Sequence, residues 1–251
     1  MGPTDELIPL LKKLRLSGLL ESLELRINQA VDDKSSYPEF LLQLVSDELE
    51  RREGKQLLSR LRRANFEHKK TIEDFDFAFN PSVPQSKVID LATCIFVTRK
   101  RNALILGDTG TGKSHVAQAI GHRACLQGLD VHFLSAQKFF STLRAARADD
   151  TYDRAMTKYQ KPDLLIIDDM GLRDLRHDEP LDLYELIRGR YEPGSLLMTS
   201  NREAKEWNLL FADARMASAA MDRLLYDAIV LNFEGESYRN PSKQKRKAKS
   251  K

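Results

Sequence analysis

The chain has 251 residues, of which 41% are hydrophobic and 31% charged, and its formal net charge is only +3. This length fits one large domain, or one domain with a small companion, and it excludes neither an enzyme nor a binding module. No run approaches the roughly 18 apolar residues of a membrane span, the charged N-terminal segment is unlike a secretory signal, and two cysteines with five scattered histidines indicate a cytoplasmic protein without disulfides or a structural metal.

Residues 4–67 are predicted to be helical. Thr4 is a candidate N-cap for a first leucine-rich helix, and Pro38 suits the first turn of a later one. Basic residues gather at the end of this region and just beyond it: Arg51, Arg52, Lys55, Arg60, Arg62, Arg63, Lys69 and Lys70. These eight bases face only two acids, Glu53 and Glu67, an excess of six. The cluster suits a DNA backbone of any sequence, and the alternative is a solvated helix face.

The rest of the chain follows an alternating pattern. A connector over residues 69–86 is punctuated by prolines, and strand-like runs then alternate with helical patterns. The predicted strands are 103–107, 131–134, 163–168, 195–199 and 228–233. This alternation predicts an α/β fold with a five-stranded parallel sheet flanked by helices. We therefore expect a helical domain over 1–68 for DNA binding or oligomerisation, a nucleotide domain over 69–239, and a basic disordered tail over 240–251.

The most specific motif follows the first predicted strand. It fits the pattern G-x-x-x-x-G-K-S and consists of Gly107, Asp108, Thr109, Gly110, Thr111, Gly112, Lys113 and Ser114. The glycines let backbone N–H groups approach phosphates, and the helix that leaves the loop favours an anion at its N-terminus. Lys113 supplies a positive charge for the β- and γ-phosphates, and Ser114 offers a hydroxyl to Mg²⁺. The sequence therefore predicts a site for ATP and Mg²⁺.

Polar residues end the next two central strands. Asp168 and Asp169 follow an apolar run, and a parallel sheet delivers both to the edge where the phosphate loop begins. We expect Asp168 to support the Mg²⁺ ion and Asp169 to orient or deprotonate the attacking water. Asn201 ends the following strand and is predicted to reach between Asp169 and the γ-phosphate. The alternative for each residue is an ordinary turn at the end of a strand.

Taken together, these motifs resemble the IstB-like ATPases, helper proteins of insertion-sequence transposition that belong to the AAA+ class and are relatives of the DnaC-type helicase loaders. The resemblance runs in consistent order through most of the chain. It rests on residues 71–77, 112–115, 161–169, 190–192, 199–201, 206–207, 221–224 and 235–239. The chain departs from the family at Asp169, where AAA+ proteins usually have the longer glutamate, and at Asp108, where the family often has proline.

The resemblance implies roles that spacing alone does not reveal. Arg223 matches the arginine that related proteins insert into a neighbouring subunit's nucleotide site, and Arg239 matches the arginine that senses the γ-phosphate. The implied protein is an ATPase that assembles as a homo-oligomer on duplex DNA, with nucleotide between subunits, and assists the transposase of the same mobile element. Two alternatives stay open: a DnaC-like loader of a replicative helicase, and an ATP-assembled DNA scaffold with very slow hydrolysis.

Overall fold

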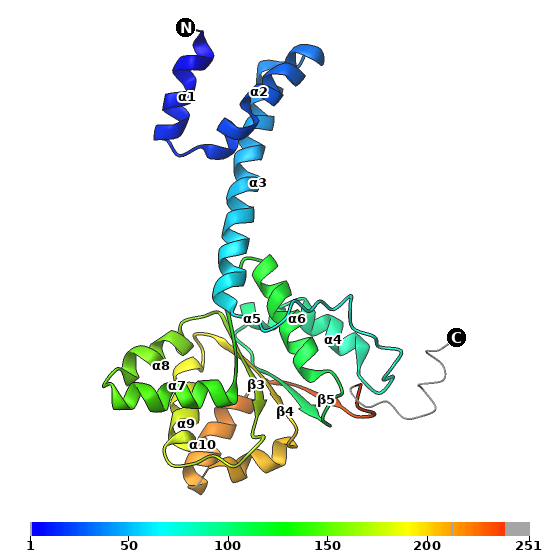
Figure 1. Cartoon of the computed structure of the whole chain (residues 1–251). Helices are drawn as coiled ribbons and strands as arrows, with labels where there is room; N and C mark the ends of the chain where they lie inside the picture. The colour runs from blue at the N-terminus through cyan, green and yellow to red at the C-terminus, as the bar shows by residue number, and fades with distance from the viewer. Residues whose placement is uncertain (1, 212, 239–251) are drawn as a thin grey trace. The chain divides into compact units, whose positions relative to one another are not determined.

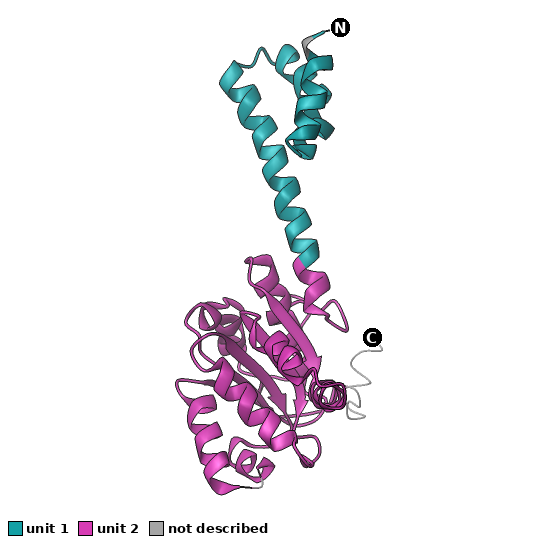
Figure 2. Cartoon of the chain, turned by 90° about the vertical axis from the view of Figure 1, so that its left-hand side faces the viewer, with its two compact units in different colours: residues 1–59 teal, residues 60–251 magenta. Residues whose placement is uncertain are grey.

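The computed structural model describes residues 2–211 and 213–238, and the chain forms two compact units (Figure 2). Unit 1 is Met1–Ser59 and unit 2 is Arg60–Lys251, so the division falls inside helix α3 (Tyr37–Ala64). The tail predicted over 240–251 lies outside the described residues. No described helix combines the length and the apolar character that crossing a bilayer requires.

Unit 1 is helical, as predicted. Its elements are α1 (Pro3–Lys13), α2 (Ser17–Asp32) and the greater part of α3. The prediction of Thr4 as an N-cap is wrong: Gly2 caps α1, and Pro3, whose fixed φ suits a first turn, begins it. Pro38 lies in the first turn of α3, as its ring predicts. The position of a proline, which lacks an N–H, therefore decides where each of these helices begins.

The packing of α2 on α3 depends on a small residue and an ion pair. A Cβ on Gly18 would lie 2.6 Å from the Cα of Glu48, so only glycine lets the two helices approach this closely. The Gly18 N–H donates to the Glu48 carboxylate at 2.5 Å. Arg26 donates to Asp47 at 2.6 Å and holds the pKa of that carboxyl at about 2. Only three apolar side chains form the buried centre of the unit: Leu11, Leu23 and Leu44.

Unit 2 is built on a five-stranded parallel sheet with the order β2-β3-β4-β1-β5, which confirms the predicted fold. The strands are β1 (Ala103–Gly107), β2 (Val131–Ser135), β3 (Leu164–Met170), β4 (Ser195–Ser200) and β5 (Ile229–Phe233). Apolar runs without alternation, such as residues 164–167, form strands that are buried on both faces.

Helices cover both faces of this sheet (Figure 1). They are α4 (Gln85–Ala92), α5 (Ile95–Thr98), α6 (Lys113–Leu126), α7 (Ala136–Ala148), α8 (Tyr152–Gln160), α9 (Glu179–Arg190), the 3-10 helix η1 (Ala204–Leu210) and α10 (Ala214–Leu225). Leu165 and Ile167 of β3 belong to the core shared with α7, α8, α9 and α10. Ile166 faces the other way, toward Gly121 of α6, where an added Cβ would lie 2.7 Å from its Cδ1.

The strand ends define one functional edge. Because all five strands run in parallel, their carboxyl ends meet at the same edge of the sheet. β1 leads there into the predicted phosphate loop, and β3 delivers Asp168 and Asp169. The pairing of β3 with β4 shifts at this point: Ile167 pairs with Met198, but Met170 pairs with Ser200. Two aspartates therefore lie opposite a single residue of β4, which is a β-bulge.

A buried arginine secures the opposite edge of the sheet. Arg190 is 1% exposed, and burial lowers the pKa of its guanidinium to about 10. It donates hydrogen bonds of 2.7 to 3.2 Å to the main-chain carbonyl oxygens of Tyr159, Gln160, Pro162, Asp163 and Ser195. These carbonyls belong to the end of α8, the turn before β3 and the start of β4. One side chain therefore fixes how β3 and β4 enter the sheet.

Replacing this arginine tests that role. Arg190→Leu removes the arginine donor from five carbonyl groups, two of them fully buried, so we expect the free energy of unfolding to fall by at least about 3 kcal/mol. Urea denaturation followed by circular dichroism measures it. Arg188→Leu is the matched control, because Arg188 is 59% exposed and pairs only with Glu185, and its cost should stay below about 1 kcal/mol. Equal losses in the two variants would contradict the role.

Candidate nucleotide-binding site

The phosphate loop adopts a conformation that only glycine allows at three positions. The φ angles are 129° at Gly107, 84° at Gly110 and 98° at Gly112, all in the left-handed region. A Cβ at Gly107 would collide with the carbonyl of Phe233, and one at Gly110 with the Ser237 side chain. Gly112 is the N-cap of α6, so the free N–H groups of the first helical turn lie at the loop. The loop thus presents main-chain donors to an anion.

Lys113 places a buried positive charge inside this loop. The residue is 5% exposed, and its ammonium group donates to the carbonyl oxygens of Gly107 at 2.8 Å and Asp108 at 2.7 Å. The hydroxyl of Thr111 donates to the Asp108 carbonyl at 2.8 Å and closes the turn. A fixed cation surrounded by main-chain N–H groups matches the charge of a triphosphate. The residues present therefore fit ATP.

Ser114 and the two aspartates form the acidic side of the site. Asp168 is 6% exposed and accepts a 2.5 Å hydrogen bond from the hydroxyl of Thr199. Burial raises the pKa of Asp168 above its ordinary value, and the hydrogen bonds from Thr199 and the Ser114 hydroxyl only partly offset this rise. Asp169 is exposed beside it. A hydroxyl and a carboxylate in contact are hard oxygen donors of the kind that Mg²⁺ prefers, so Ser114 and Asp168 fit that ion.

Two distant segments pack on the outside of the loop. Phe75 lies against Gly112, where an added Cβ would be 2.5 Å from its ring, and its ring meets that of His115 edge to face at 5.4 Å. The Tyr238 N–H donates to the Gly110 carbonyl at 2.9 Å. Neither Phe75 nor Tyr238 was predicted to act at the site, although the aromatic residues of 75–79 were a usable signal. Both segments restrain the loop.

Of the three remaining catalytic candidates, the structure describes two, Asn201 and Arg223. Asn201 follows β4, is exposed, and makes no side-chain hydrogen bond within the described chain. Arg223 is partly exposed on α10 and donates to the Ala219 carbonyl at 2.7 Å. Among the described residues, no hydrogen bond or ion pair joins Arg223 to the loop or to the aspartates. Arg239 lies outside the described residues. The roles of all three stay predictions.

The eight basic residues predicted to contact DNA are divided between the units and differ in their partners. Three pair with acids within their own unit: Arg51 with Glu21 at 3.0 Å, Arg52 with Glu48 at 2.6 Å, and Arg63 with Asp130 at 2.6 Å. Arg60 donates to the Cys125 carbonyl at 3.1 Å. Within the described ranges, no acid pairs with Lys55, Arg62, Lys69 or Lys70. No carboxylate of the described residues neutralises these four cations, so they are available to an external partner.

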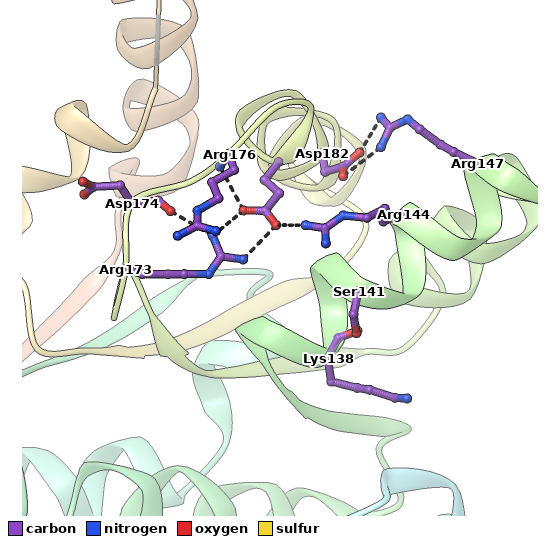
Figure 3. Close-up of polar contacts among 9 residues, drawn as sticks. Lys138, Ser141, Arg144, Arg147, Arg173, Asp174, Arg176 and Asp182 are labelled. Carbon is purple, nitrogen blue, oxygen red and sulfur yellow. Dashed lines mark hydrogen bonds and ion pairs between the residues drawn. The ribbon is translucent and has the colours of Figure 1, made fainter.

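A second polar cluster lies on α7, α9 and the loop that leaves β3 (Figure 3). Glu179, buried at the start of α9, accepts from Arg144 at 2.7 Å and from both terminal nitrogens of Arg173 at 2.7 and 2.8 Å. Asp182 binds Arg147 through both oxygens, at 2.7 and 3.0 Å. Because Arg173 comes from the loop and Arg144 from α7, Glu179 fixes the segment that directly follows the two aspartates.

Comparison with known proteins identifies relatives along nearly the whole chain. The family model described as IstB-like ATP binding protein matches residues 9–248. An insertion-sequence protein of Mycobacterium tuberculosis is 38% identical over 230 residues, which cover 91% of this chain and 92% of the relative. The insertion sequence IS21 protein of Pseudomonas aeruginosa is 35% identical over 243 residues, 97% of this chain and 91% of that relative.

Solved structures show the same fold at lower identity. DnaA from Aquifex aeolicus, in its AMPPCP-bound form, gives a TM-score of 0.56 at 21% identity and aligns with 68% of this chain and 52% of its own. DnaI gives a TM-score of 0.55 at 18% identity, with 67% of this chain and 90% of its own. This chain therefore spans about half of DnaA. At these identities the likeness shows the AAA+ fold and nothing finer.

Loss of the loop cation tests the nucleotide site. Lys113→Ala removes the charge aimed at the phosphates, and we expect ATP affinity to fall about 10- to 100-fold, the worth of one charge-assisted contact. Isothermal titration calorimetry measures it. Lys87→Ala, which removes an exposed lysine from α4, is the matched control and should leave affinity unchanged. Equal ATP affinity in the wild type and in Lys113→Ala would show that the phosphate loop does not bind ATP.

Proposed function

The chain belongs to the family of IstB-like ATP-binding proteins, and from that premise we propose that it is a DNA-dependent ATPase that assists a transposase. It assembles on duplex DNA with ATP bound between subunits, and hydrolysis favours release. One observation carries the enzymatic part: Lys113, Ser114, Asp168 and Asp169 converge on one edge of the sheet. A cation, an oxygen pair for a metal and a free carboxylate are the parts that phosphoryl transfer to water requires.

Each residue has a distinct task in the reaction. Lys113 and the N-terminus of α6 hold the β- and γ-phosphates, and Ser114 and Asp168 hold Mg²⁺, which neutralises developing charge when it is bound. Asp169 is exposed, so its carboxylate is free to accept a proton from water as the water oxygen bonds to the γ-phosphorus. The bond between that phosphorus and the bridging oxygen breaks, which leaves ADP and phosphate.

Self-association is supported by Arg223 and by the surface of unit 1. Among the described residues, no hydrogen bond or ion pair joins Arg223 to its own chain's site, as expected of a residue that acts on a neighbour's nucleotide. Unit 1 exposes apolar side chains on α1 and α3 that its small core does not cover: Leu7, Leu10, Leu14, Leu41, Leu42, Val45 and Leu49. An apolar surface of this extent is typical of an interface between proteins. We therefore propose a homo-oligomer.

DNA and transposase are proposed as partners on two grounds. The relatives named above are proteins of insertion sequences, and such elements move by transposition of DNA. Four of the predicted cations have no acid partner in the described chain and suit a phosphate backbone: Lys55, Arg62, Lys69 and Lys70. Backbone contacts alone carry no sequence information, so binding to duplex DNA is proposed to be non-specific. We also propose a cytoplasmic location, where ATP and DNA are both present.

The short side chain of Asp169 favours a second candidate function. Its side chain is one methylene shorter than the glutamate usual in AAA+ proteins, and this lengthens the path to an attacking water. A scaffold that assembles with ATP and hydrolyses it very slowly fits that feature. The two candidates share binding of ATP and DNA and differ only in turnover.

Phosphate release, measured with and without duplex DNA, tests the proposal. We expect Mg²⁺-dependent turnover that two unrelated DNA sequences raise equally. Asp169→Asn should bind ATP normally but lose about 10²- to 10⁴-fold in turnover, because an amide cannot accept the proton. Asp178→Asn, which removes an exposed carboxylate beyond the site, is the matched control and should stay within twofold of wild type.

Two outcomes would change the proposed function. Turnover of Asp169→Asn equal to wild type would mean that another residue activates the water. Undetectable turnover in the wild type, with normal ATP binding, would favour the scaffold. Asp169→Glu then decides whether the short side chain is the cause, since a longer carboxylate should raise the rate.

A further inference from the structure

Thr199 occupies the point where β4 meets both aspartates of β3. The residue is fully buried. Its hydroxyl donates to a carboxylate oxygen of Asp168 at 2.5 Å and accepts the backbone N–H of Asp169 at 2.9 Å. A hydroxyl has one hydrogen to donate and lone pairs to accept with, so both bonds form at once. A single oxygen atom thus links the side chain of one aspartate to the main chain of the next.

The bulge explains why such a link is needed. In a regular strand, Asp168 and Asp169 would point to opposite faces of the sheet. Instead the backbone of Asp169 has φ +57°, a left-handed conformation that is strained for a residue other than glycine. The Asp169 N–H leaves the ladder, and the Thr199 hydroxyl replaces the ladder carbonyl as its acceptor. Thr199 therefore stabilises the local conformation that presents both carboxylates at one edge.

Ser200, the next residue of β4, shows a contrasting use of a buried hydroxyl. It is also fully buried. Its hydroxyl donates to the Met170 carbonyl at 2.7 Å and accepts the Arg202 N–H at 3.0 Å, both main-chain groups. It contacts neither carboxylate. The Thr199 hydroxyl therefore contacts the aspartates, whereas the adjacent and equally buried Ser200 hydroxyl bonds other main-chain groups.

We propose that Thr199 is the positioning residue of the ATPase site, a role that rests on the proposed hydrolysis of ATP. Its hydroxyl aims the Asp168 carboxylate toward the Ser114 hydroxyl and fixes the backbone from which Asp169 reaches the water. The sequence pattern favoured Asn201 for the polar contact at the end of β4, but Asn201 lies beyond the strand and is exposed. Thr199, two residues earlier, binds the Asp168 carboxylate and the Asp169 main-chain N–H.

Three variants separate positioning from general stability. Thr199→Val removes the hydroxyl at nearly constant volume, Thr199→Ser retains it, and Ser200→Ala removes the neighbouring hydroxyl. In Thr199→Val we expect turnover to fall 10- to 100-fold, the usual effect of losing a group that orients a metal ligand. The gain in ATP affinity on adding Mg²⁺ should fall by a similar factor, while affinity without Mg²⁺ stays within twofold. Thr199→Ser should recover most of both losses, and Ser200→Ala should keep wild-type values.

The outcomes distinguish this inference from the function on which it rests. Ser200→Ala losing as much as Thr199→Val, or Thr199→Ser failing to recover, would reduce Thr199 to a structural residue and overturn the inference. Turnover in Thr199→Val equal to that of the wild type would also overturn the inference. A wild type that binds ATP without turning it over would remove the proposed hydrolysis alone. The gain in ATP affinity on adding Mg²⁺ then still tests whether Thr199 positions Asp168. Equal gains in the wild type and in Thr199→Val would overturn the inference.

Discussion

The burial of two opposite charges at one edge of a parallel sheet is the constraint on which the site depends. Lys113 and Asp168 are 5% and 6% exposed, and a charge so far from water is costly unless polar groups surround it. Carbonyl oxygens of the loop satisfy the ammonium group, and the hydroxyls of Thr199 and Ser114 satisfy the carboxylate. The left-handed glycines of the loop and the bulge in β3 are the backbone distortions that allow both arrangements.

Much of the fold could be predicted from local sequence pattern. Apolar runs bounded by turns located all five strands to within two residues, because strands buried on both faces need continuous apolar sequence. The phosphate loop was recognisable because its chemistry needs glycines and lysine at fixed spacing. The order of the strands also follows once the fold class is known, and the carboxyl edge then locates Asp168.

Contacts between segments far apart in the sequence could not be predicted from such local patterns. Nothing in the residues around Thr199 marks a bulge, since register is decided by pairing across strands. The five carbonyl acceptors of Arg190 come from segments that meet only in the folded sheet. The basic cluster was visible as charge, but sequence does not reveal that Arg51, Arg52 and Arg63 have acid partners. Thr4 failed as a cap because α1 already begins at Pro3, one residue earlier.

In the proposed oligomer, two subunits would together form the complete catalytic site. One chain would supply the loop, the metal-binding oxygens and Asp169, and Arg223 of a neighbour would supply positive charge to the transferred phosphate. Subunits carrying Arg223→Ala keep an intact loop, and subunits carrying Lys113→Ala keep an intact arginine. Phosphate release by a mixture of the two, with co-assembly on DNA confirmed by light scattering, is the most direct test. We predict that the mixture is clearly more active than either variant alone, and a co-assembled mixture no more active than its parts would contradict the shared site.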